Sequence, residues 1–164
     1  MQRPNHSRRM STQSGNNILE TALVLTPVLA MLFGILDFSM AIFVRSTMQS
    51  AVREGVRYAV TYQVNGGCQD AAIQQVVKNY AAGLLSSTTN AAKIHTRYYR
   101  PNDLTTEVTG AGSNAPGNVV QVSVEGYQWP WIAPLLRPGG SISVTVFAAD
   151  RMESLPGGAA PPCR

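Results

Sequence analysis

An apolar run from Thr21 to Val44, in which Asp37 is the only ionisable side chain, constrains this chain more than any other feature. The run is 24 residues long, and a helix needs about 20 residues to cross a bilayer core of ~30 Å. It also explains why charged residues make up only 13% of the chain, against about 25% in soluble domains. The run therefore predicts one membrane-spanning helix over residues 21–44.

A polar, basic segment, residues 1–15, precedes this run and has no apolar periodicity. It contains Arg3, Arg8 and Arg9, and a short basic tail is the part most easily kept in the cytoplasm. We therefore expect a cytoplasmic N-terminus and a periplasmic C-terminal part. Without these arginines ten basic residues face nine acidic ones, and no dense cationic cluster indicates nucleic-acid binding.

Two carboxylates and a proline are unusual for a simple anchor. Asp37 lies inside the run, and a carboxylate there costs a few kcal/mol unless it has a partner. Asp37 therefore either has a specific partner or lies near enough to the outer interface to reach headgroups and water. Glu20 at the head of the run has a pairing role or simply favours the helix macrodipole. Pro27 removes a backbone hydrogen bond and predicts a kink.

The segment around Gly15 combines three sequence features in a defined order. A basic leader, a glycine and then a glutamate, Glu20, at the head of an apolar helix resemble the processing signal of type IV prepilins. The resemblance implies that a prepilin peptidase cleaves between Gly15 and Asn16, and that the apolar helix stays attached. It also implies that Glu20 pairs in the membrane with the N-terminal amine of a neighbouring subunit.

A longer stretch resembles the TadE/TadG family of tight-adherence (Flp-type, type IVb) pilus systems. The shared features are the initial glutamate, a Gly-x-x-Asp-Phe step at residues 34–38, a following helix rich in Ala, Arg and Gly, and a late strand–turn–strand; they cover residues 15–62 and 118–154. The resemblance implies a minor pseudopilin of the bacterial inner membrane that takes part in assembling a pilus for adhesion or secretion. The implied partners are other pilin or pseudopilin subunits, the assembly machinery, the prepilin peptidase and the lipid bilayer.

Beyond the membrane, the helical spacing continues and predicts one long helix over residues 16–62, within which Gly55 indicates close packing of another element. Asn65-Gly66-Gly67 ends it. The pattern then predicts a second helix at 70–85, capped by Asp70, and strands at 94–99, 119–127 and 141–148. We expect an α+β domain, residues 63–154, in which the second helix packs on a mainly antiparallel sheet of three or four strands. A Gly/Pro-rich tail, residues 155–164, follows.

Two further features concern the external domain. Cys68 and Cys163 are the only cysteines. Neither has a CxxC spacing or a nearby His, so we expect no metal site. The two cysteines form a disulfide if the domain lies in an oxidising compartment, and otherwise they are two free thiols. Trp129, Trp131 and Ile132 begin an apolar excursion, residues 129–136, between the last two strands. This patch faces a partner, touches the membrane surface or covers the sheet.

No catalytic set is evident, because His6 and His95 are isolated and no phosphate-binding motif precedes a helix. We expect no enzyme and no cofactor. Two alternatives to the pilus role remain: an unprocessed membrane-anchored periplasmic scaffold or binding protein of the pilus machinery, and a secreted protein cut after Ala41. The mature N-terminus separates these hypotheses, because it would be Asn16, Met1 or Ile42 respectively.

Overall fold

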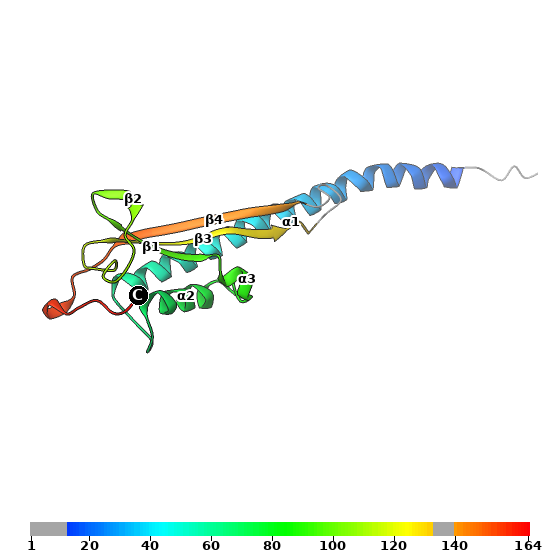
Figure 1. The fold of residues 1–164 in the computed structure, drawn as a ribbon. Coiled ribbons are helices and arrows are strands. Elements are labelled where there is room, and N and C mark those ends of the chain that lie inside the picture. The colour runs from blue at the N-terminus through cyan, green and yellow to red at the C-terminus, as the bar shows by residue number, and fades with distance from the viewer. Residues whose placement is uncertain (1–12, 133–139) are drawn as a thin grey trace, which may run out of the picture.

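A single long helix, α1 (Gln13–Val60), organises the molecule (Figure 1). The computed structural model describes residues 13–132 and 140–164. The 48 residues of α1 span about 72 Å at 1.5 Å per residue, and the helix continues through Pro27. The predicted continuous helix is confirmed; it ends two residues earlier than expected, where Thr61 and Tyr62 form a turn. The predicted leader lies mostly outside the described residues.

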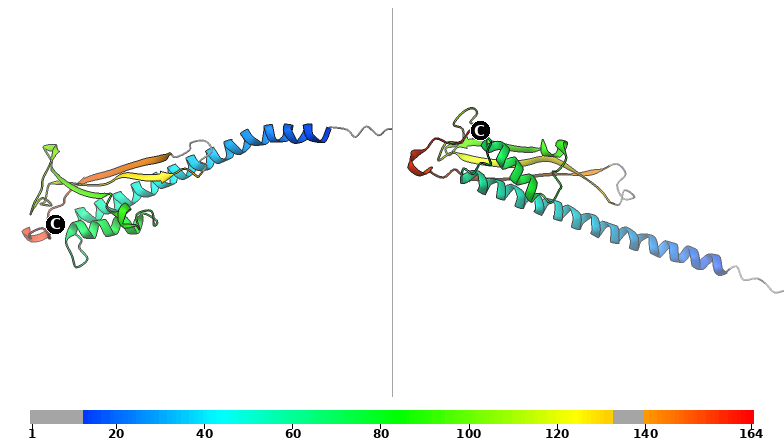
Figure 2. Two further views of the ribbon diagram at one scale, coloured as in Figure 1. Left: turned by 45° about the vertical axis from the view of Figure 1, so that its right-hand side comes forward. Right: turned by 90° about the horizontal axis from the view of Figure 1, so that it is seen from below.

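The remaining elements form a small α+β domain on the C-terminal half of α1, as predicted (Figures 1 and 2). In chain order they are α2 (Gln69–Tyr80), α3 (Thr88–Ala91), β1 (Ile94–Arg100), β2 (Asp103–Glu107), β3 (Val119–Pro130), β4 (Ser141–Arg151) and the 3-10 turn η1 (Pro156–Gly158). In the described residues the strands form one four-stranded antiparallel sheet in the order β2-β1-β3-β4. Its long strands β3 and β4 run beside α1.

The core lies between this sheet and the two longer helices. Alternation along β3 turns Val120, Val122 and Val124 inward. The register of β3 on β4 shifts between Val124 and Tyr127, and Gly126 has φ +65 at this bulge, so the strand bends without losing the buried Tyr127.

A stripe at spacings of three and four residues faces the domain along α1. The buried members of this stripe are Asp37, Val44, Met48, Ala51, Val52, Gly55, Val56, Ala59 and Val60. Burial by the domain thus begins at Asp37, and α1 extends well beyond it toward the N-terminus (Figure 2).

Two local predictions need correction, and one strand was not predicted. The second helix begins at Gln69 and ends at Tyr80 rather than at Leu85, because a turn with Ala82 and Gly83 at positive φ follows it. Cys68, not Asp70, is its N-cap residue; the Asp70 carboxylate is used elsewhere. The sequence also gave no indication of β2, whose five residues are all exposed and therefore lack apolar alternation.

Candidate membrane-proximal site

The N-terminal part of α1 projects from the domain with its apolar side chains uncovered. Leu23, Met31 and Ile35 are exposed, as are most of their neighbours from Ile18 to Leu36. Asn17–Val60 is long and apolar enough to cross a membrane. A surface of this kind is stable only in lipid or against other apolar helices.

Asp37 has a specific partner in the described structure. Its Oδ1 atom accepts a hydrogen bond of 2.7 Å from the backbone N–H of Ile132, 95 residues away in the sequence. The Asp37 side chain is 5% exposed. The hypothesis of a specific partner is therefore favoured over a carboxylate that only reaches water, and this bond joins the segment just after β3 to the middle of α1.

The described residues of the predicted Trp patch differ in their exposure to solvent. Trp129 is half-buried and packs against the domain core, opposite Ile142 of β4. Trp131 is also half-buried, whereas Ile132 is 51% exposed. Residues 133–136 of the predicted patch lie outside the described residues. Trp129 therefore covers the sheet, and Ile132 presents an apolar side chain outward.

The three residues of the predicted processing and pairing site lie at the far end of α1. Gly15 and Asn16 belong to its first turn, and Glu20 is exposed one turn further on. Glu20 borders a shallow surface hollow with Val24 and Val28. This part of α1 is the most distant from the sheet (Figure 1).

At the opposite end of the domain, a disulfide joins Cys68 to Cys163, as predicted. Beside it, the Arg164 guanidinium donates from Nε to Asp70 Oδ2 at 2.8 Å, and the Tyr98 hydroxyl donates to Asp70 Oδ1 at 2.8 Å. Arg164 also lies over the Tyr98 ring, 4.9 Å from its centroid. Burial and the Asp70 carboxylate raise the pKa of Tyr98 far above its usual value. The tail is therefore tied to the domain by covalent and ionic contacts.

A buried polar network behind the disulfide was missed by the sequence analysis. Gln69 is fully buried; its Nε2 donates to the Ala59 carbonyl at 2.8 Å, and its Oε1 accepts from Asn114 Nδ2 at 2.6 Å. Asn114 also donates to the Pro162 carbonyl at 3.0 Å. These bonds fix the end of α1, the start of α2 and the tail against one another, although nothing in the pattern of these polar residues marks them as buried.

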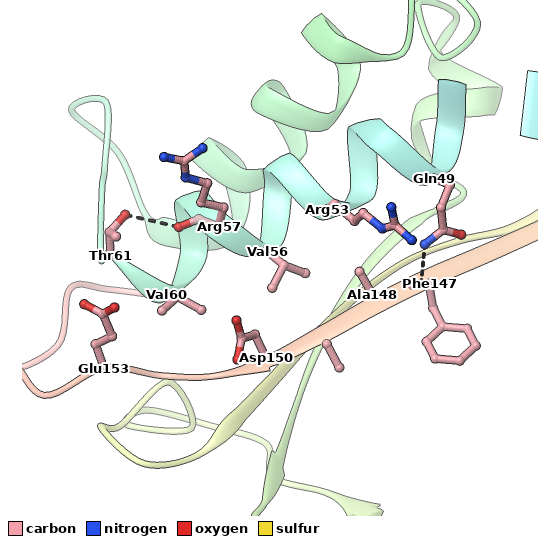
Figure 3. Close-up of a pocket in the computed structure, with 11 residues that line it drawn as sticks. Gln49, Arg53, Val56, Arg57, Val60, Thr61, Phe147, Ala148, Asp150 and Glu153 are labelled. Carbon is pink, nitrogen blue, oxygen red and sulfur yellow. Dashed lines mark hydrogen bonds between the residues drawn. The ribbon is translucent and has the colours of Figure 1, made fainter. Parts of the chain in front are cut away.

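Between α1 and the edge strand β4 lies an open groove of about 570 Å³ (Figure 3). Gln49 closes one end, where its Nε2 donates to the Phe147 carbonyl at 3.0 Å. Its charges come from Arg53 and Arg57 on α1, from Asp150 near the end of β4 and from Glu153 just after that strand. No His or Cys lines it, and no cluster of three metal-ligating side chains occurs among the described residues.

Comparison with known proteins supports the sequence resemblance. Residues 18–57 match the model of a family described as TadE-like protein. Residues 18–57 of α1 are a TadE-like segment. The match includes Glu20, Asp37 and Gly55, so it covers both the projecting part of α1 and much of its packed part. No curated protein and no solved structure gave a significant match.

The TadE-like segment associates the protein with Tad pilus systems, and this family is a pilus-associated one rather than a family of enzymes. Together with the apolar helix it indicates a single-pass membrane protein. The domain elements from α2 onward lie outside the matched residues.

Proposed function

We propose that this protein is a minor pilin-like subunit that takes part in assembling a Tad (Flp-type) pilus. The observation that carries the proposal is the form of α1: a TadE-like helix whose apolar first half, headed by Glu20, projects uncovered from a small folded domain. Such a helix can pack laterally among other subunits while its domain stays outside the bundle.

The domain lies in the periplasm under this proposal, and the N-terminus faces the cytoplasm. The disulfide between Cys68 and Cys163 supports this orientation, because disulfides persist in oxidising compartments and are rare in the cytosol. Arg3, Arg8 and Arg9 on the other side of the apolar run support it too.

Prepilin peptidase cleavage after Gly15 is part of the proposal. The bond lies in the first turn of α1, where the first N–H groups have no intrahelical partners and the turn can unwind at little cost. Cleavage would leave an ammonium group at Asn16. Glu20 would then pair with the amine of a neighbouring subunit, since a carboxylate in the membrane needs a cation.

The deciding experiment compares Glu20→Ala with Thr21→Val in cells that lack the native protein. Thr21 is a matched control because it is adjacent and its hydroxyl bonds only to the Asn17 carbonyl of its own helix in the described structure. We expect both variants to be made and inserted, and only Glu20→Ala to lower the number of pili. Normal piliation in the Glu20→Ala strain would refute the pairing mechanism.

Sequencing the mature N-terminus separates the alternatives. Asn16 supports processing as a pilin, whereas Met1 would favour an unprocessed scaffold of the pilus machinery. Ile42 would indicate secretion after cleavage at Ala41, but that cut would separate Asp37 from the domain and break its bond to Ile132.

A further inference from the structure

We propose that the described end of the β3–β4 hairpin, here called the tip and consisting of Trp131, Ile132 and Ile142, lies in the lipid leaflet on the domain's side of the membrane, where Asp37 holds it against α1. The domain would thus touch the bilayer at two places rather than hang from a single helix. This inference rests on α1 crossing the bilayer, but on neither cleavage nor polymerisation.

The depth of the tip follows from its attachment point. Asp37 is 17 residues beyond Glu20, which corresponds to about 26 Å along a helix. A hydrocarbon core of ~30 Å that begins near Glu20 therefore ends about 4 Å beyond Asp37. Because the Ile132 N–H lies 2.7 Å from the Asp37 carboxylate, the tip is at the same depth, near the outer boundary of the hydrocarbon.

The side chains around the tip fit this depth. Phe38, Ile42 and Phe43 on α1 are more than half exposed, as is Ile132. Ile142 of β4 lines the same hollow as Phe38 and Ile42, and the polar members of that lining are Arg45, Ser143 and Thr145, which lie further along the helix and the strand. The first cation of the helix after Asp37 is Arg45, about 12 Å further along, where phosphate headgroups begin.

A hydrogen bond between a backbone N–H and a carboxylate, such as that between Ile132 and Asp37, stabilises the fold more in lipid than in water. A backbone N–H without a partner costs several kcal/mol in hydrocarbon, whereas in water a solvent molecule replaces the bond. A carboxylate at this depth also needs donors. At a wet surface neither group would need the other, but within the membrane each reduces the cost of burying its partner.

Trp131 belongs to the tip, whereas Trp129, the other tryptophan of the chain, packs against the core, so the intrinsic fluorescence of Trp129→Phe reports the location of the tip without labels. The full-length protein is reconstituted in phosphatidylcholine vesicles that contain lipids brominated near the headgroup or near the chain end. We expect strong quenching by the shallow bromines, weaker quenching by the deep ones, and protection from aqueous acrylamide. The quenching is therefore measured in Trp129→Phe, and Trp131→Phe, in which only the core-packed Trp129 emits, is the reference for a tryptophan covered by its own domain.

Three variants test the role of Asp37. Asp37→Ala removes the acceptor, and we expect its tryptophan emission to shift to longer wavelength with loss of lipid quenching. Asp37→Asn keeps an amide oxygen for the Ile132 N–H, so its quenching should remain near the wild-type level. Ser39→Ala is the matched control, since the Ser39 hydroxyl bonds to the Ile35 carbonyl within α1. Retention of the disulfide and of the far-ultraviolet circular dichroism shows that each variant is folded.

Two results would overturn the proposal. Quenching by acrylamide but not by brominated lipid would place the tip in water. Protection of Trp131 from both quenchers in the pure reconstituted Trp129→Phe protein would mean that protein, such as a second copy, covers the tip instead of lipid. Normal pilus numbers in Glu20→Ala would leave this inference intact, because that experiment tests pairing between subunits and not the position of the hairpin.

Discussion

A Cβ atom added to Gly55 would lie 2.6 Å from Cγ2 of Val77, so α1 and α2 approach each other as closely as a glycine permits. Real Cβ contacts are not this short, and the short, stiff Val77 side chain has no room to move within a packed core. The glycine predicted from the sequence to permit close packing does so against α2.

We therefore predict that Gly55→Ala destabilises the protein by about 1–2 kcal/mol, although alanine is the better helix former by about 1 kcal/mol, because overpacking costs more. The double variant Gly55→Ala/Val77→Ala should be less destabilised than the sum of the two single changes. Thermal unfolding in detergent, followed by circular dichroism, measures this. Simple additivity of the two effects would show that the contact is not strained by the added methyl group.

Reduction of the disulfide is the second test. The Cys68–Cys163 bond spans 95 residues, and closing so long a loop is worth about 2–5 kcal/mol. We expect a reductant to lower the midpoint of urea unfolding of the wild type but to leave Cys68→Ser/Cys163→Ser unchanged. An equal decrease of the unfolding midpoint in the wild type and in the double variant would mean that the reductant does not act through this disulfide.

The ionic contact of the tail gives a third prediction. Arg164→Ala leaves the partly buried Asp70 carboxylate without its cation, and we expect a loss of about 1–2 kcal/mol of stability. In the Asp70→Asn background, which keeps an acceptor for the Tyr98 hydroxyl, Arg164→Ala should cost less. A double-mutant cycle from urea unfolding measures the coupling, and a coupling of zero would contradict the ion pair.

The pH dependence of stability tests a contact across the sheet. The Arg97 guanidinium on β1 bonds to Glu125 on β3 and lowers the pKa of that carboxyl from 4.5 to about 2. Because the pKa is lower in the folded state, the contribution of Glu125 is complete above about pH 4.5 and is lost as the pH falls to about 2. Solvent reaches this pair, so we expect Glu125→Gln to cost only about 0.5–1 kcal/mol at neutral pH.

The difference between wild type and Glu125→Gln should disappear when unfolding is repeated at a pH below the lowered pKa. Glu153→Gln is the matched control, since Glu153 is exposed and belongs to none of the ion pairs of the described residues. A Glu125→Gln effect that persists in acid would exclude ionisation as its cause.

Polar residues show most clearly where prediction from the sequence stopped. Gln69 and Asn114 are fully buried partners, 45 residues apart, but each taken alone looks like a surface residue, because Gln and Asn usually are. Asp70 was assigned to a helix cap from its position, whereas the folded chain brings Tyr98 and Arg164 to it. The local preferences of single residues cannot show which distant side chain the fold will place beside them.

The sequence by itself determined the long helix, its apolar run, the α+β class and the strands at 94–100, 119–130 and 141–151 to within a few residues, because periodicity and length are local properties of the chain. Only the tertiary structure decided where the domain begins to cover α1 and what Asp37 bonds to. That contact joins residues 95 positions apart, and it depends on the twist, the bulge and the length of β3 and β4, which together carry the hairpin tip to the middle of the helix.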